Sequence, residues 1–330
     1  MALGWGILGT AGIADRAVCP AIAQIDEAEL VAVLSRDRSR GEEFARRHGG
    51  ARVFTDYDEL LAHPDLDIVF VASPNALHAD QVVAAAAAGK HVFCDKPLAT
   101  SVADAQRAME ACRAAGVKLG IHFQTRYHRF VPEVRQALAD GRIGDVVIAE
   151  MEVSPGRNPL RGWRTDPGLA GLGSVNNLGV HAYDLLRYLL GHEVTEVTAL
   201  LDVGRQEALE TVALVLLRFD NGTLAYVNAN QAVPDHRPDL VLYGTEGRIT
   251  GESVTRPGLD GEVRILADGK ESSFETSSRD ASLRAVQAFQ RAVTEDTEPD
   301  ASGLDGLRSV QLTDAIARSA REGKTVRLDT

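Results

Sequence analysis

The sequence has few cysteines and no surplus of positive charge. Its three cysteines, Cys19, Cys94 and Cys112, are widely spaced among 330 residues and form no Cys-x-x-Cys or Cys/His pattern. We therefore expect free, buried thiols rather than a disulfide framework or a zinc site. The net charge of −12 argues against a protein that binds nucleic acid or an anionic membrane surface, since both require a basic face.

Long hydrophobic runs are also absent. No apolar stretch reaches the ~18 residues of a membrane span, and the first residues lack the basic and apolar segments of a secretory leader. We expect a cytoplasmic protein. The hydrophobic content of 45% and the charged content of 25% are typical of soluble globular proteins. A length of 330 residues suffices for two domains.

Strand and helix patterns alternate over the first third of the chain. Short apolar strands are expected at residues 3–9, 30–34, 53–54, 67–72, 92–94 and 118–122, with helices between them. This alternation predicts an α/β Rossmann domain, which is a doubly wound parallel sheet with right-handed crossovers. We place this dinucleotide-binding domain at residues 1–122.

A glycine-containing turn follows the first strand. A literal G-x-G-x-x-G at Gly4, Gly6 and Gly9 lies inside the strand itself, so we discard it. The informative segment runs from Gly9 to Ala14 and is a G-x-A-x-x-A variant, whose small residues let a pyrophosphate approach backbone N–H groups. A plain strand–turn–helix is the alternative. The predicted phosphate-binding residues are Gly9, Thr10, Ala11, Gly12 and Ile13.

The second strand ends in Ser35-Arg36-Asp37. At this position an acidic residue commonly binds the ribose 2′-hydroxyl of NAD. A small hydroxyl followed by a guanidinium suits a 2′-phosphate instead. We therefore favour NADP(H) over NAD(H), with Ser35 and Arg36 as ligands. The alternative is that Arg36 is merely exposed while Asp37 caps the helix at residues 38–47.

Two later strands end in polar segments. One is followed by Ser73-Pro74-Asn75 and the other by Asp95-Lys96-Pro97. A proline disfavours α geometry at the residue before it, so Lys96 should be extended at the edge where open α/β sheets bind ligands. Lysine is scarce among the 35 basic residues. A solvated surface lysine is the alternative.

Residues 123–330 predict a substrate-binding and oligomerisation domain of the α+β class, with a large, mainly antiparallel sheet. Period-two segments and the Asp220-Asn221-Gly222 turn indicate hairpins. Strands are expected at 146–153, 194–201, 211–219, 223–230, 240–243, 262–266 and 325–328, and helices at 132–140, 282–293 and 303–321.

Asn177, His181 and Asp184 follow helical spacing, so they should share one face of a helix that ends at Leu190 and lines a cleft. A structural histidine is the alternative for His181.

Five segments in order carry a resemblance to a known family: GILGTAGIA, SPNALH, CDKPLA, GWR with AGLGSVNNLGVHAYDLLRYLLG, and GLDGLRSVQLTDAIARSAREGKTV. Together they resemble the glucose–fructose oxidoreductase / inositol dehydrogenase (Gfo/Idh/MocA) family over essentially the whole chain. The resemblance implies NAD(P)-dependent hydride transfer to or from a sugar, anhydrosugar or cyclitol. It also implies an open-faced C-terminal sheet that forms a homodimer or homotetramer. The Ser35-Arg36 pair and GWR are most similar to the NADPH-linked 1,5-anhydrofructose reductase branch.

By this resemblance Lys96, in a D-K-P version of the family's E-K-P motif, and His181 are catalytic. Asn177 stands where the family most often has aspartate, and an amide can hold a hydroxyl but cannot accept its proton. The resemblance implies further cofactor contacts at Ser73, Pro74, Asn75, His78, Asp95, Lys96, Gln124, Trp163 and Arg164. The expected substrate contacts are Lys96, Arg126, Arg164, Asn177 and His181, and no metal ligand is expected.

Two other functions stay open at this point. Asn177 is compatible with a protein that binds NADP(H) without turnover, as a redox sensor or an assembly partner. Redox-assisted glycoside cleavage is the other, although the Ser35-Arg36 pair favours an exchangeable cofactor.

Overall fold

The computed structural model describes residues 2–203, 208–234, 239–255 and 258–329. The chain divides into two compact units. The first unit holds Met1–Phe123 and Ser282–Val310, and the second holds Gln124–Ala281 and Gln311–Thr330. Within the described residues, no helix is both long and apolar enough to cross a membrane. The three cysteines are buried free thiols, as predicted.

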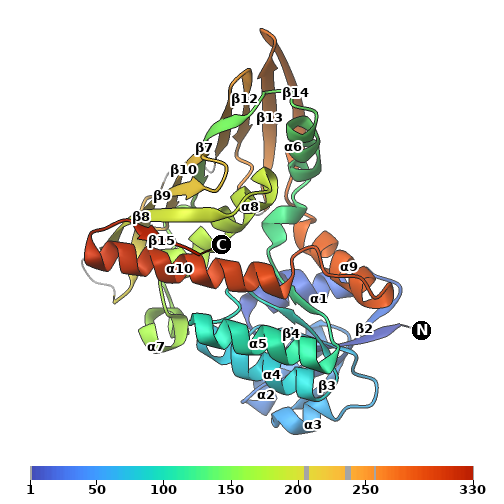
Figure 1. The fold of residues 1–330 in the computed structure, drawn as a ribbon. Helices are drawn as coiled ribbons and strands as arrows, with labels where there is room; N and C mark the ends of the chain where they lie inside the picture. Colours follow the sequence, from blue (N-terminus) through green and yellow to red (C-terminus); the bar gives the residue numbers. More distant parts are fainter. Residues whose placement is uncertain (1, 204–207, 235–238, 256–257, 330) are drawn as a thin grey trace. The chain divides into compact units, whose positions relative to one another are not determined.

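The first unit is built on a six-stranded parallel sheet (Figure 1). Its strand order is β3-β2-β1-β4-β5-β6, so the chain begins in the middle of the sheet and winds outward in both directions. The strands are β1 (Leu3–Leu8), β2 (Ala28–Leu34), β3 (Arg52–Phe54), β4 (Ile68–Val71), β5 (His91–Cys94) and β6 (Leu119–Ile121). The entirely buried β4 is typical of a parallel strand covered on both faces. The predicted doubly wound sheet is confirmed.

Helices connect these strands, and several begin at the polar caps that the sequence places there. Asp37, Asp56 and Ser101 each accept a hydrogen bond from a backbone N–H of the first helical turn. The helical segments are η1 (Ala14–Val18, one π turn), α1 (Cys19–Ile22), α2 (Arg38–Arg47), α3 (Tyr57–Leu61), η2 (Asn75–Leu77), α4 (His78–Ala87) and α5 (Val102–Ala115).

The structure corrects the domain assignment of residues 282–310. The sequence placed them in the second domain, but α9 (Ala281–Thr294) packs into the core of the first unit. The ring of Phe289 stacks on Phe93 at 4.8 Å, and Gln290 accepts a 2.9 Å hydrogen bond from the indole of Trp5. Gly120 leaves room for Phe289, because a Cβ there would lie 2.4 Å from the ring.

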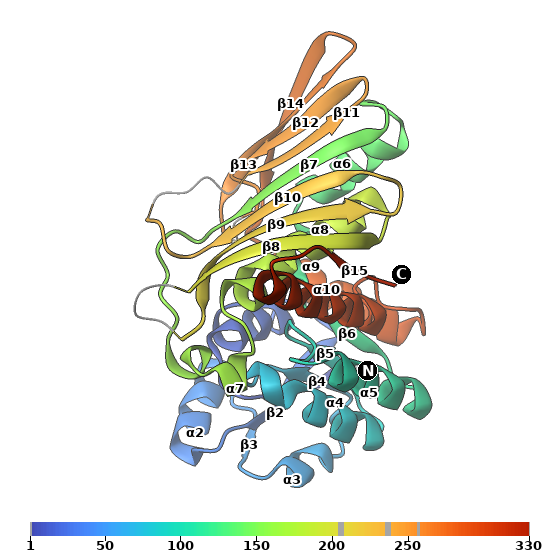
Figure 2. The same cartoon turned by 60° about the vertical axis from the view of Figure 1, so that its left-hand side comes forward.

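The second unit contains a nine-stranded sheet in the order β14-β13-β12-β11-β7-β10-β9-β8-β15 (Figure 2). All neighbouring strands are antiparallel except β7 and β10. The strands are β7 (Val146–Val153), β8 (Val194–Val203), β9 (Glu210–Phe219), β10 (Leu224–Asn230), β11 (Leu240–Gly244), β12 (Gly247–Glu252), β13 (Asp260–Ala267), β14 (Lys270–Ser277) and β15 (Val326–Arg327). The predicted mainly antiparallel sheet is confirmed.

Two strands, β12 and β14, were not predicted. The strand β12 begins at Gly247 and pairs with β11 and β13. The edge strand β14 is mostly exposed and polar, with Thr276 buried and Phe274 and Ser277 half-buried, so its hydrophobic alternation is weak. Both strands form through pairing with their neighbours and not through their own sequence pattern.

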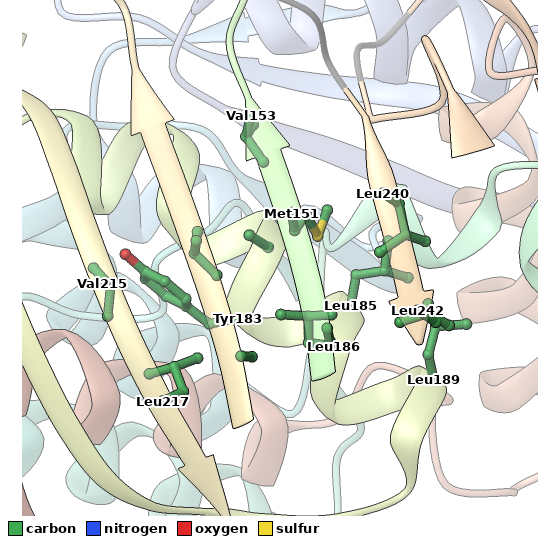
Figure 3. Packing of buried hydrophobic residues seen from close by; sticks show 14 of the residues in the cluster. Met151, Val153, Tyr183, Leu185, Leu186, Leu189, Val215, Leu217, Leu240 and Leu242 are labelled. Carbon is green, nitrogen blue, oxygen red and sulfur yellow. The ribbon is translucent and has the colours of Figure 1, made fainter. Parts of the chain in front are cut away.

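One face of the large sheet is covered by helices and the other is exposed. Figure 3 shows Tyr183, Leu185 and Leu186 of α8 (Val180–Leu190) packed on Met151 of β7 and on neighbouring strands. On the opposite face Leu216 is 56% exposed. The remaining helical segments are η3 (Gln124–Tyr127), α6 (Phe130–Ala139), η4 (Gly162–Thr165), α7 (Pro167–Ala170), η5 (Val175–Gly179, one π turn) and α10 (Gly303–Glu322).

Candidate active site

The turn after β1 requires glycine at its first position. Gly9 has a φ of 102°, and a Cβ there would lie 3.2 Å from the carbonyl oxygen of Ala72. Gly4 and Gly6 instead serve strand packing, since a Cβ would lie 1.7 Å from the carbonyl of Asp65 and 2.7 Å from Leu66, respectively. The turn lies at the carboxyl end of the sheet where the strand order reverses, which is the usual ligand site of such sheets.

Two arginines that the sequence analysis missed lie against this turn. The guanidinium of Arg16 folds back over Gly12, 2.7 Å from the position of a Cβ there. From the next helix, Nη2 of Arg40 donates to the carbonyl of Thr10 at 3.4 Å. Arg40 lies in the first turn of α2, within the run SRDRSR that follows β2, so its place in this basic run could have drawn attention to it. The turn therefore presents cationic groups to a phosphate ligand.

Ser35 and Arg36 lie at the end of β2 in different environments. The buried hydroxyl of Ser35 donates to the carbonyl of Asp37 at 2.7 Å, so its only proton is used inside the turn. Arg36 is exposed, and Asp37 accepts from the backbone N–H of Arg40 as the cap of α2. The alternative to a 2′-phosphate site was an exposed Arg36 with Asp37 as a helix cap, and both of these features are present. An exposed Arg36 is still able to contact a ligand.

The segment after β4 contains a fully buried histidine. Nδ1 of His78 lies 2.8 Å from the carbonyl oxygen of Pro97, and Nε2 lies 2.9 Å from that of Ser73. The imidazole is 0% exposed, and both of these contacts lie within the first unit. Asn75 is also buried, while Ser73 and Pro74 are half-buried.

Asp95 and Lys96 follow β5 and are both half-buried. The carboxylate of Asp95 lies 3.6 Å from Nδ1 of the buried His122, an ion-pair distance longer than a hydrogen bond. Burial alone would raise the pKa of Asp95, but His122, Lys96 and His78 outweigh it and lower the pKa to about 2. Asp95 is thus a carboxylate at neutral pH, which favours the protonated form of Lys96 beside it.

In the second unit, η3 and α8 are joined by two side-chain contacts. The hydroxyl of Thr125 lies 3.2 Å from Nδ1 of His181. One helical turn beyond His181 in α8, Asp184 accepts two hydrogen bonds of 2.8 and 2.6 Å from Arg126. The side chains of this pair are 3% and 0% exposed. The guanidinium of Arg126, a predicted substrate contact, thus joins η3 to α8.

Asn177 lies in a π turn and not in a regular α-helix. The sequence predicted one continuous helix with Asn177, His181 and Asp184 on one face. The π turn Val175–Gly179 changes the direction of Asn177, whose amide nitrogen donates to Oε1 of Gln231 at 3.0 Å. Of the three residues predicted to share one helix face, His181 and Asp184 do so. They contact Thr125 and Arg126, which are adjacent in the chain. A π turn is common at functional sites.

The remaining predicted residues also lie in the second unit. In η4 the guanidinium of Arg164 lies 4.4 Å from the centre of the Trp163 ring, and both residues are half-buried. Gln124 is buried, and within the described residues its Oε1 has no hydrogen-bond partner. Among all the residues that the structure describes, no group of three histidine, cysteine or acidic side chains is arranged to hold a metal ion.

Comparison with known proteins assigns the chain to a family. Residues 3–123 match an oxidoreductase family with an NAD-binding Rossmann fold, and residues 131–250 match the GFO/IDH/MocA C-terminal domain. The chain belongs to the Gfo/Idh/MocA oxidoreductase family. The resemblance inferred from the sequence is thus confirmed, and the first unit is an NAD(P)-binding Rossmann domain.

Named Gfo/Idh/MocA relatives match over nearly the full length. A 1,5-anhydro-D-fructose reductase of Ensifer adhaerens is 32% identical, with 99% of this chain and 98% of the relative covered. A D-xylose 1-dehydrogenase (NADP(+)) of Haloferax volcanii is 33% identical, with 98% and 99% covered. The crystal structure of an aldose-aldose oxidoreductase from Caulobacter crescentus superposes with a TM-score of 0.91 at 28% identity, with 99% and 100% covered.

Proposed function

We propose that this protein transfers a hydride between NADP(H) and a sugar, anhydrosugar or cyclitol. The observation that carries the proposal is the Gly9–Ile13 turn, which combines a glycine-dependent backbone with the guanidinium groups of Arg16 and Arg40. The named relatives support the substrate class, since one reduces an anhydrosugar and another oxidises a pentose.

A preference for NADP(H) over NAD(H) follows from the charges around the second strand. No acidic side chain takes the position at the end of β2, where Ser35 is followed by the exposed Arg36. Arg40 adds a guanidinium from the first turn of α2 and already contacts the glycine turn. We propose that Arg36 and Arg40 bind the 2′-phosphate, and that Ser35 provides a small neutral residue beside it.

Arg40→Gln tests this preference. We expect the Kd for NADPH to rise roughly 10-fold or more, because a charge-assisted hydrogen bond to a phosphate contributes about 1.5–3 kcal/mol. The Kd for NADH should change little, since NADH has no 2′-phosphate. Isothermal titration calorimetry with both cofactors measures the two constants.

Arg46→Gln is the matched control, since Arg46 is also exposed but lies in the last turn of the same helix. An equal loss of affinity for NADPH in the Arg40 and Arg46 variants would contradict the assignment.

The reaction that we propose needs a proton transfer beside the hydride transfer. Bound NADP(H) supplies or accepts the hydride. His181 takes the hydroxyl proton during oxidation and returns it during reduction, because an imidazole titrates near neutral pH. Thr125, at 3.2 Å from Nδ1, orients that ring. The ammonium of Lys96 binds the same substrate oxygen and stabilises its developing negative charge.

Asn177 has a different role from the aspartate common in the family. Its amide donates to Gln231, and it can hold a substrate hydroxyl but not accept the proton. Proton transfer is therefore left to His181 and Lys96. The non-catalytic sensor and the glycoside hydrolase are not favoured, because the relatives reported above are a reductase and a dehydrogenase.

We also propose that the exposed face of the large sheet joins two copies of the chain. Tyr243, Ile148 and Leu224 are cross-strand neighbours on this face and are 37%, 42% and 44% exposed. Leu216 and Leu200, on β9 and β8, extend the apolar surface with exposed fractions of 56% and 72%. Exposed apolar surface of this extent is typical of an interaction face.

Leu216→Glu is expected to convert the oligomer to monomers, because a buried, unpaired carboxylate opposes association. Size-exclusion chromatography with light scattering measures the mass. Leu304→Glu is the control, since Leu304 is similarly exposed (51%) but lies in α10 outside the sheet. A monomeric wild-type protein, or dissociation caused equally by the control, would contradict this proposal.

The function itself is tested by incubating the protein and NADPH with a panel of ketoses, anhydroketoses and oxidised cyclitols. We expect at least one compound to cause oxidation of NADPH. Binding of NADPH without turnover on any compound would support the non-catalytic alternative instead.

A further inference from the structure

His78 joins two loops at the carboxyl edge of the parallel sheet. The Ser73 carbonyl, 2.9 Å from Nε2, belongs to the loop after β4. The Pro97 carbonyl, 2.8 Å from Nδ1, belongs to the loop after β5. The second of these loops carries Lys96. Because the ring is completely buried, it forms a fixed connection between the two loops and is not a mobile surface group.

The backbone on both sides of Lys96 is fixed by hydrogen-bond contacts. On one side, the amide of Asp95 donates to the carbonyl of Val71 at 2.9 Å. On the other side, Pro97 has no N–H to donate, so its carbonyl oxygen is its one backbone group that takes part in a hydrogen bond. That oxygen faces His78, and Leu98 after it is 0% exposed. The starting point and direction of the Lys96 side chain depend on these contacts.

Only one nitrogen of a neutral imidazole carries a proton. Burial lowers the pKa of His78; among the facing charges, Asp95 raises it and Lys96 lowers it. The ring is therefore neutral at pH 7 and donates through one nitrogen. Both ring nitrogens lie within hydrogen-bond distance of a carbonyl oxygen, and the contact that fixes the Lys96 loop requires the proton on Nδ1.

We propose that His78 is a positioning residue for Lys96. Its Nδ1–H holds the carbonyl of Pro97 and thereby directs the ammonium of Lys96 toward the reacting oxygen of the substrate. The proposal rests on the proposed function for the role of Lys96. It assigns His78 an effect on turnover without contact with either cofactor or substrate.

Two substitutions distinguish the contribution of Nδ1 from that of Nε2. In His78→Asn the amide nitrogen takes nearly the place of Nδ1, so a donor to Pro97 is retained. In His78→Gln the amide nitrogen takes nearly the place of Nε2, so the bond to Pro97 is lost. Both variants replace the same buried ring by an amide, and both therefore report equally on a merely structural role.

We expect His78→Asn to keep kcat within about threefold of wild type and His78→Gln to lower kcat roughly 10-fold or more, since small displacements of a catalytic group are costly. The Kd for NADPH should stay within about threefold in both, because the proposal has the buried ring act through Lys96 and not through the cofactor. Amide hydrogen exchange of residues 95–99 should accelerate in the glutamine variant alone. Thermal unfolding should shift similarly in the two.

Equal losses of kcat in the two variants, or equal acceleration of exchange, would overturn the proposal. A wild-type protein that turns over no sugar would overturn the proposed function instead, while the exchange experiment would still decide whether His78 holds the Lys96 loop. If neither variant folds, the protonation state of His78 in the wild type decides. A protonated Nδ1 in ¹⁵N spectra of histidine-labelled protein supports the proposal, and an unprotonated Nδ1 overturns it.

Discussion

Replacing Lys96 by methionine lowers kcat by roughly 10²-fold or more, which corresponds to about 2.7 kcal/mol of transition-state stabilisation. Methionine has a similar length and fills the same space, so the loss reflects the missing positive charge. Asp95, the adjacent residue, is a carboxylate whose pKa is lowered in part by the charge of Lys96, so the variant removes one member of a pair of opposite charges. A neutral side chain at residue 96 leaves the developing charge on the substrate oxygen without its partner.

Steady-state kinetics with saturating NADPH measure this effect, and fluorescence titration shows whether NADPH still binds. We expect its Kd to stay within about threefold of wild type, because the phosphates are bound by other residues. Lys270→Met is the control, since Lys270 is an exposed lysine at the start of β14. Near-normal turnover of the Lys96 variant would remove this residue from the mechanism.

Asp184→Ala is expected to lower the free energy of unfolding of the second unit by about 3–5 kcal/mol. The cause is the guanidinium of Arg126, which would remain buried without a counter-ion between η3 and α8. The ring of Tyr188, 4.6 Å from that guanidinium, does not replace a carboxylate. His181 lies in the same helix, so its orientation should be lost with the pair.

Denaturant unfolding followed by circular dichroism measures the loss. Asp80→Ala is the control, because Asp80 forms an ion pair with Arg107 that is largely exposed, and exposed pairs contribute little. The double variant Arg126→Met/Asp184→Leu should recover much of the stability, since apolar residues can replace a buried ion pair. A single variant as stable as the Asp80 control would show that the pair is not needed.

Local chemistry made the parallel sheet and its binding edge predictable from the sequence. Gly9 is required by a positive φ and by the nearby Ala72 carbonyl, and such a position shows in the sequence as a small residue between a strand and a helix. Lys96 could be placed because Pro97 restricts its backbone. Asp37 could be recognised as a cap for the same kind of local reason.

Long-range pairing was not predictable. The pattern of α9 shows which of its faces is apolar but not that Phe289 docks on Phe93, nearly 200 positions earlier in the chain. The same limit applies to Arg126, whose type suggests a ligand contact while its partner is the distant Asp184. A sequence motif likewise cannot show that both ring nitrogens of His78 face backbone carbonyls.

The π turn at Val175–Gly179 was missed for a different reason. Helical periodicity assumes 3.6 residues per turn, and one wider turn redirects every side chain before it. Asn177 consequently contacts Gln231 at the end of β10.

The most direct test of the proposed function is the transfer of deuterium from NADPH that carries deuterium at both hydrogen positions of C4 of the nicotinamide. A carbonyl sugar identified by NADPH oxidation is reduced, and its product is examined by NMR and mass spectrometry. We predict one deuterium on the carbon that carries the new hydroxyl, with the transfer slowed by Lys96→Met and by His181→Ala. A product without deuterium, or bound NADPH that reduces no sugar, would contradict hydride transfer as the function of this protein.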